Sequence, residues 1–310
     1  MRMPSLPEGL LQASDRWLHS RAGLRIRQIL HVGLTVATLA FVGSHLRGAG
    51  LEQIYASLPR QPAFYVLFCA GYMLLPLSEY LSYRRLLPRG FPLPDILRKR
   101  AFNDALFDYS GEAYLLTRAE HLEGVGFRQA AVAVKDITLI SGLVSNSATL
   151  LLLLGAFVVE HGDLSARFGG SFEIGATSGA IFVALLSGGV FFMRRRVISV
   201  QGEVFRTLLL IHSARLVAAM TIQVLQWSVV LPAVPVVQWL EVFAIWMLVT
   251  RIPFVPNRDL LLAGVGLSLA DFLVAPRATV VGLFVAAAAL PLLTHVIVLA
   301  SGVFAKSRAG

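Results

Sequence analysis

The sequence is poor in cysteine and in charged residues, and these two absences exclude several classes of protein. Cys69 is the only cysteine among 310 residues, so the chain forms no intrachain disulfide and no cysteine cage for a metal. Only 15% of the residues are charged, whereas 56% are hydrophobic. This composition excludes an ordinary soluble enzyme, a small secreted domain held by disulfides and a disordered chain. We interpret Cys69, which lies inside an apolar run, as a packing residue.

The sequence also lacks the short motifs that carry common chemistry. It contains no G-x-x-x-x-G-K-[ST], G-x-S-x-G or G-x-G-x-x-G pattern, and its seven histidines form no H-x-x-x-H cluster. We therefore expect no ATP-driven transport by this polypeptide, no metal site and no cofactor. No constellation of catalytic residues is recognisable, so a non-enzymatic function is favoured.

The charge that is present is mostly positive. There are 27 Lys and Arg residues against 18 Asp and Glu residues, a net charge of +9. The basic residues form clusters between apolar runs, which is typical of loops facing anionic lipid on the cytoplasmic side of a membrane. Nucleic acid is therefore not an expected partner.

Long apolar runs dominate the chain. A bilayer crossing needs about 20 apolar residues, and the runs near or above this length are 29–46, 63–82, 134–159, 172–193, 213–233, 236–250 and 278–304. An eighth run, 259–275, is interrupted by glycine and aspartate, which suits a membrane-entering segment better than a helix facing lipid. The sequence predicts an all-α, polytopic membrane helix bundle with about seven to eight spans and two interrupted segments.

The basic clusters predict the domain organisation and the orientation. Arg47 follows the first run where a signal peptidase needs small neutral residues, so we interpret that run as an uncleaved span. We divide the chain into a cytoplasmic basic segment (1–27), a single transmembrane domain (28–305) and a short tail (306–310). The positive-inside rule places the N-terminus and the segments 83–133 and 194–212 in the cytoplasm of a cell (inner) membrane.

The side of the C-terminus depends on the number of spans. Lys306 and Arg308 favour an inside location, whereas seven spans would place the C-terminus outside. A full eighth span at 259–275 would reconcile the two, so both a span and a re-entrant segment stay open there.

The segment 98–126 is too charged to face lipid and too apolar for an ordinary loop. In one continuous helix, Asp104, Asp108 and Glu112 would share a face. A bend at Ser110-Gly111 would instead give a helical hairpin that enters the membrane. In both cases the polar groups need an enclosed or wet space, and we expect Glu112 to be paired with a cation or a helix N-terminus. An amphipathic helix on the membrane surface is the alternative.

The stretch 251–271 has a similar character. Pro256 ends one element, Asn257 is a good N-cap, and Asp259 would lie in the first helical turn. With Arg251 and Arg258 nearby, this helix N-terminus would suit a phosphate. The alternative is a capped cytoplasmic turn whose arginines reach the interface. Two interrupted segments in the two halves of a chain are typical of a transporter binding site.

Four stretches together resemble a known family. They are L-S-Y-R-R-L-L (81–87), F-N-D-A-L-F-D-Y-S-G-E-A-Y (102–114), V-K-D-I (134–137) and R-I-P-F-V-P-N-R-D (251–259). Their order over about 25–305 resembles the membrane domain of the lysylphosphatidylglycerol synthase type. Asn103, Gly111 and Glu112 match its first motif, and Pro253 and Pro256 lie where its second begins. The family has a Gly-rich turn and Arg-Glu there, which this chain replaces with Asn-Arg-Asp.

The resemblance implies a flippase-like membrane domain without the soluble aminoacyl-transfer domain. We therefore expect a lipid carrier whose partners are membrane lipids, an anionic phospholipid or a polyprenyl phosphate. The residues expected to bind the headgroup are Asn103, Asp104, Gly111, Glu112, Arg118, Arg251, Asn257, Arg258 and Asp259.

Two other functions stay open. One is a membrane scaffold of a lipid-modifying or glycosylation complex, and the other is an integral membrane enzyme with Asp104 or Glu112 as general base. A second copy of the chain and a lipid-modifying enzyme are the candidate protein partners. Outside the two segments, we expect Glu79 to pair with Arg84 or Arg85, and Lys135 and Asp136 to form a pair at the interface.

Overall fold

The computed structural model describes residues 58–105, 109–119, 122–159, 170–250, 273 and 275–307. Every regular element in these ranges is an α-helix, which confirms the predicted all-α class for this part of the chain. The helices are α4 (Pro62–Leu86), α5 (Leu93–Ala105), α6 (Ser110–Ala119), α7 (Phe127–Val159), α9 (Gly170–Val197), α10 (Gly202–Val230), α11 (Val236–Val249) and α13 (Arg277–Ser307).

Four of the described helices, α4, α7, α10 and α13, are long and apolar enough to cross a membrane. They coincide with four of the predicted runs, and α9 and α11 coincide with two more. α11 has 14 residues, about 21 Å at 1.5 Å per residue, so it is shorter than the hydrocarbon layer of about 30 Å. The runs 29–46 and 259–275 lie outside the described residues, so the number of spans stays a prediction.

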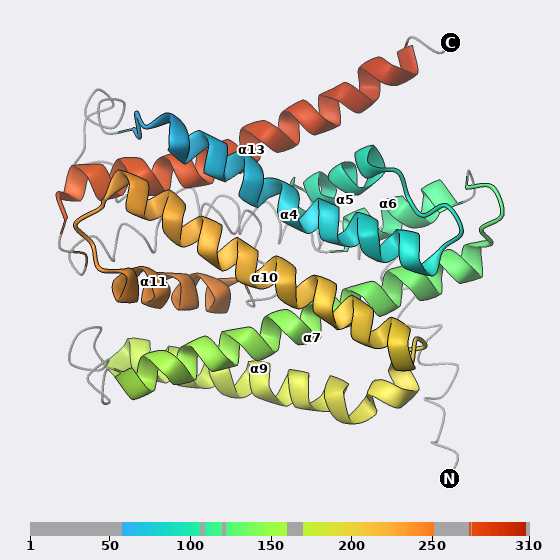
Figure 1. Ribbon diagram of the computed structural model, residues 1–310, viewed down its shortest axis with the longest axis horizontal. Helices are drawn as coiled ribbons and strands as arrows, with labels where there is room; N and C mark the ends of the chain where they lie inside the picture. The colour runs from blue at the N-terminus through green and yellow to red at the C-terminus, as the bar shows by residue number, and fades with distance from the viewer. Residues whose placement is uncertain are drawn as a thin grey trace, which may run out of the picture.

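The long helices share two ends, as Figure 1 shows. At one end, α4 and α9 finish and α7 and α10 begin. We call this the basic end, because its helix termini and connections carry Arg84, Arg85, Arg89, Arg128, Arg194, Arg195, Arg196 and Arg206. At the opposite end, α4 and α11 begin, and so does α13, which then runs toward the basic end. α11 and α13 therefore begin at the same end of the bundle.

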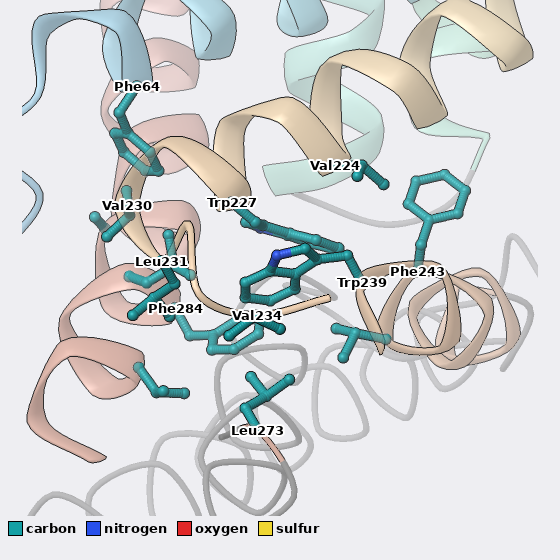
Figure 2. Close-up of a cluster of buried hydrophobic side chains, with 14 of the residues drawn as sticks. Phe64, Val224, Trp227, Val230, Leu231, Val234, Trp239, Phe243, Leu273 and Phe284 are labelled. Atoms are coloured by element: carbon teal, nitrogen blue, oxygen red, sulfur yellow. The ribbon is translucent and has the colours of Figure 1, made fainter. Parts of the chain in front are cut away.

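A cluster of aromatic side chains fixes the packing at the end opposite the arginines (Figure 2). The ring of Trp227 on α10 lies 5.4 Å from that of Trp239 on α11 and 6.1 Å from that of Phe284 on α13. Phe64 brings α4 into the same cluster, and all four side chains are fully buried. Burial of such large apolar side chains supplies most of the packing free energy here. We call this the tryptophan cluster.

A second apolar cluster lies at the basic end. Tyr83 of α4, Ile96 of α5, Leu115 of α6 and Ile137 of α7 are buried together with Phe91 of the α4–α5 connection. This cluster joins the short helices α5 and α6 to the long helices α4 and α7. α5 also contacts α13, so the two short helices pack between several long ones.

The segment 98–126 forms a helical hairpin, and the single continuous helix is wrong. α5 ends at Ala105 and α6 begins at Ser110, where Tyr109 has a φ of 68°. The hydroxyl of Ser110 donates to the carbonyl of Phe102 at 2.7 Å, which ties the start of α6 to α5. Asp104 and Glu112 thus belong to different helices and share no helical face, and Asp108 lies outside the described residues.

Candidate functional site

The centre of the site is a buried lysine between two carboxylates. Lys99 of α5 is 4% exposed; its ammonium donates to Glu79 of α4 and lies 3.2 Å from Oε1 of Glu112 on α6. Burial alone would lower the pKa of Lys99, but the charges of Glu79 and Glu112 outweigh it and raise that pKa above its ordinary value. Lys99 therefore stays charged and joins three helices.

An amide clamp completes the environment of Glu112. The side chain of Asn103 donates to Oε2 of Glu112 at 2.8 Å and accepts from the backbone N–H of Gly111 at 2.6 Å. The side chain of Glu112 is only 14% exposed. Glu112 therefore does not lie on a solvated helix face, and its expected pairing with a cation is confirmed through Lys99. Whether the hairpin enters the membrane or lies at its surface stays a prediction.

Gly111 is required by this geometry. A β-carbon at position 111 would lie 2.0 Å from the backbone oxygen of Lys99. The backbones of α6 and α5 therefore approach each other closely at this position. This contact places the start of α6 directly against the residue that carries the central charge.

A second set of polar groups continues the site onto α10. The hydroxyl of Ser82 donates to the carbonyl of Ser78 at 2.7 Å, so the 3.3 Å contact with His212 uses the Nε2–H of the ring as donor. In a neutral ring, Nδ1 of His212 is then an acceptor. This atom is buried and has no hydrogen-bond partner among the described residues.

Arg215 lies on the same face of α10 as His212, three residues further along. Its Nη2 donates to the hydroxyl of Ser145 on α7 at 3.1 Å, while its buried Nε has no hydrogen-bond partner within the described ranges. Thirteen residues separate it from Gly202, so it lies about 20 Å along α10, close to the middle of this candidate span.

These groups form one polar layer between the two apolar clusters. On α10, His212 and Arg215 lie between Leu208, in a small apolar cluster with Ile140 and Ile198, and Val224 of the tryptophan cluster. On α7, the buried polar side chains at this depth are Ser145, Asn146 and Thr149. On α4, they are Ser78, Glu79 and Ser82. The layer therefore crosses the bundle at intermediate depth, and we call it the polar layer.

Asp104 lies at an exposed edge of this region. Its Oδ2 is 3.6 Å from Nε of Arg100. The same oxygen lies 3.2 Å from Nε2 of His295 on α13, a contact without hydrogen-bond geometry. The guanidinium of Arg100 stacks 4.0 Å from the ring centroid of Tyr72 and donates to the Tyr72 carbonyl. Asp104 thus connects the hairpin to the last helix rather than to Glu112.

Arg118 belongs to a separate ion cluster. Its Nε lies 3.2 Å from Asp95, a buried carboxylate that also accepts from Arg98 at 3.0 Å and from the Tyr114 hydroxyl at 2.7 Å. Burial and the bond to Asp95 raise the pKa of Tyr114. Arg118 therefore contacts α5 near its first turn and makes no ion pair with Glu112.

Of two further expectations, the first is wrong and the second is confirmed. Glu79 pairs with Lys99 and not with Arg84 or Arg85, because its side chain points into the bundle. Lys135 and Asp136 do form an ion pair at 3.1 Å, but Asp136 is fully buried and accepts from the backbone N–H groups of Ser199 and Val200. This carboxylate anchors the α9–α10 connection inside the protein.

The structure brings Asn103, Gly111 and Glu112 together, places Asp104 at the edge and separates Arg118. The other expected headgroup residues, Arg251, Asn257, Arg258 and Asp259, lie outside the described residues, so the convergence of the two interrupted segments stays a prediction. Sequence reasoning did not assign Lys99, His212 or Arg215. For Arg215 a signal existed, since it is an arginine inside the predicted span 213–233.

Comparison with known protein families, with curated proteins and with solved structures gives no match for this chain. Within the described residues, no group of three or more His, Cys, Asp or Glu side chains could hold a metal ion.

Proposed function

We propose that this protein is a lipid carrier, flippase-like or scramblase-like, that moves a phosphate-bearing headgroup along its polar layer. The observation that carries the proposal is Arg215, a guanidinium near the middle of an apolar helix whose buried Nε lacks a hydrogen-bond partner in the described part of the chain. Ionisable groups at this depth are costly to place in a membrane protein and mark pathways for charged substrates.

Arginine suits a phosphate because its planar fork of N–H donors matches phosphate oxygens. Moving a charged headgroup through hydrocarbon costs several kcal/mol, and pairing with a buried cation lowers that cost. Ser145 is hydrogen-bonded to Arg215, and Ser82 is hydrogen-bonded to His212. The two serines add neutral polar groups to the same path. During transport, the headgroup would therefore replace its hydrogen bonds to water with hydrogen bonds to these side chains.

The two nearby cations, Lys99 and Arg215, differ in whether carboxylates hold them. Lys99 is held between Glu79 and Glu112 and is not available to a ligand. Arg215 has no carboxylate within ion-pair distance among the described residues, so it is the cation that a passing phosphate would engage. The acidic groups of the layer would keep the phosphate from binding so tightly that release becomes slow.

The substrate class and the setting follow the sequence expectations. The substrate is an anionic phospholipid or a polyprenyl phosphate, and the resemblance to the membrane domain of lysylphosphatidylglycerol synthases supports this class. The protein would lie in the cell (inner) membrane with its N-terminus and its basic end in the cytoplasm. Arg251, Asn257, Arg258 and Asp259 would supply a second set of phosphate donors.

The test is lipid translocation by the purified chain in liposomes. Arg215→Gln should abolish movement of a labelled anionic phospholipid between leaflets, and Arg215→Lys should retain part of it. Arg195→Gln, at an exposed arginine of the basic end, is the matched control and should move lipid at the normal rate. Normal translocation by correctly folded Arg215→Gln would refute the proposal.

The same assay distinguishes the alternatives. A change in the mass of the lipid without transfer would favour the membrane enzyme. The absence of both transfer and mass change would favour the scaffold.

A further inference from the structure

A groove separate from the polar layer opens at the basic end of the bundle. It has a volume of about 490 Å³, which lies within the usual range of small-molecule sites. Leu86 at the end of α4, Val132 and Ala133 on the first turns of α7, and Val200 in the α9–α10 connection form its apolar walls. The groove therefore lies where three parts of the bundle meet.

The groove has room for an apolar chain. Gly126, just before α7, lines it without a side chain, and a β-carbon there would have no atom within 4 Å. Asp136 also lines it, but this carboxylate is fully buried and its oxygens are used by Ser199, Val200 and Lys135. The acidic group therefore presents no free charge to a ligand.

The rim of the groove is positively charged. Arg128 is exposed and forms no ion pair with any described residue. This distinguishes it from two other arginines of the same end, Arg85 and Arg89, which pair with Glu203 and Glu123. A free guanidinium beside an apolar groove is complementary to a ligand with an anionic head and an apolar chain.

The setting supplies such a ligand. The neighbouring Phe127 is 57% exposed at the start of α7, as expected for an aromatic ring at a membrane interface. With the basic end at the cytoplasmic interface, as the positive-inside rule predicts, the groove would open toward the headgroup and upper acyl region of the bilayer. We infer that it is a binding site for one anionic phospholipid, whose acyl chain fills the groove and whose phosphate pairs with Arg128.

This inference does not rest on the proposed function, because the groove and the polar layer share no residue. The bound lipid would be a resident that packs on the α4, α7 and α9–α10 junction, whereas a transported lipid would pass Arg215. A lipid held here would stabilise the junction that Asp136 anchors, by binding the folded state.

The test is native mass spectrometry of the purified full chain mixed with phosphatidylserine or with phosphatidylcholine of the same acyl chains. Phosphatidylserine should be retained preferentially. Arg128→Gln should lower its occupancy about fivefold, the factor that one arginine contributes toward anionic lipid near a membrane surface. Arg195→Gln, an exposed arginine outside the groove, should retain the lipid.

A second variant tests the groove itself. Gly126→Leu should fill it and reduce retention, whereas Gly155→Leu, an exposed glycine with equally open space at the other end of α7, should not. The inference is overturned if both lipids bind equally, if Arg195→Gln matches Arg128→Gln, if Gly126→Leu has no effect, or if free oleate binds as well as phosphatidylserine. Arg215→Gln should leave retention unchanged, which separates this result from the transport assay.

Discussion

The backbone oxygen of Lys99 lies so close to Gly111 that residue 111 has no space for a side chain. An added β-carbon at Gly111 would lie 2.0 Å from that oxygen, and 2.7 Å from the Lys99 side chain. The contact between these two residues therefore fixes both the separation of α5 and α6 and the position of the central charge.

Gly111→Ala should disrupt the hairpin. The obstructing atom belongs to the backbone, which cannot rotate away, so we expect a loss of about 3 kcal/mol in the free energy of unfolding, the upper end of overpacking costs. Denaturation in detergent measures it. Gly142→Ala is the control, because a β-carbon at Gly142 meets no atom within 4 Å. Equal stability of the two variants would contradict the close approach.

Lys99→Met should be strongly destabilising, although methionine is more apolar than lysine. The substitution leaves the buried carboxylates of Glu79 and Glu112 without their shared cation, which costs about 3–5 kcal/mol for a broken buried pair. The triple variant with Glu79→Gln and Glu112→Gln should recover much of that loss. If the triple variant is less stable than Lys99→Met alone, the account of the charges is wrong.

The contribution of Lys99 should be independent of pH over the neutral range. Its pKa is raised in the folded protein, so its stabilising effect is fully present below the ordinary value near 10.5 and is lost only as the pH rises through the higher folded value. The difference in unfolding free energy between wild type and the triple variant, which carries none of the three charges, should therefore be constant from about pH 6 to pH 9. A difference that falls between these values would mean that burial lowers the pKa of Lys99.

Cysteines placed before the start of α4 and at the end of α9 should be labelled from opposite sides of the membrane. In a Cys69→Ser background, Arg195→Cys should react with a membrane-impermeant maleimide only from the cytoplasmic side, and Arg60→Cys only from outside. The reason is the positive-inside rule applied to the basic end. Both positions are exposed, so burial does not prevent the reaction. Labelling of position 195 from outside would reverse the orientation.

The long helices could be predicted from the sequence because a long apolar run indicates a helix over the same residues, without reference to the rest of the chain. The runs at 63–82 and 278–304 lie inside α4 and α13, and the shortest run, 236–250, is the short helix α11. Periodicity could not decide between one helix and a hairpin at 98–126. The decision depends on the contact between Gly111 and Lys99, twelve residues apart.

The charged partners could not be predicted, because they are far apart in the sequence. Glu79 and Lys99 come from different helices, and the carboxylate of Asp136 is used by backbone groups more than sixty residues away. Arg84 and Arg85 were the expected partners of Glu79 because they are near it in the sequence. Only the direction of the Glu79 side chain, which the sequence does not give, excludes that pairing. Arg215 could have been assigned, because it is an arginine inside the predicted span 213–233.

The contact between Asp104 and His295 also sets an order of events during synthesis. The two residues are 191 positions apart, so at about 5–20 residues per second His295 is made roughly 10 to 40 seconds after Asp104. During that interval α5 lacks its contacts with α13. If the hairpin enters the membrane as predicted, its charged residues would then face lipid on that side. In that case the nascent protein would pass through a stage in which the insertion machinery must cover its polar residues, and release before α13 emerges would leave them exposed to hydrocarbon.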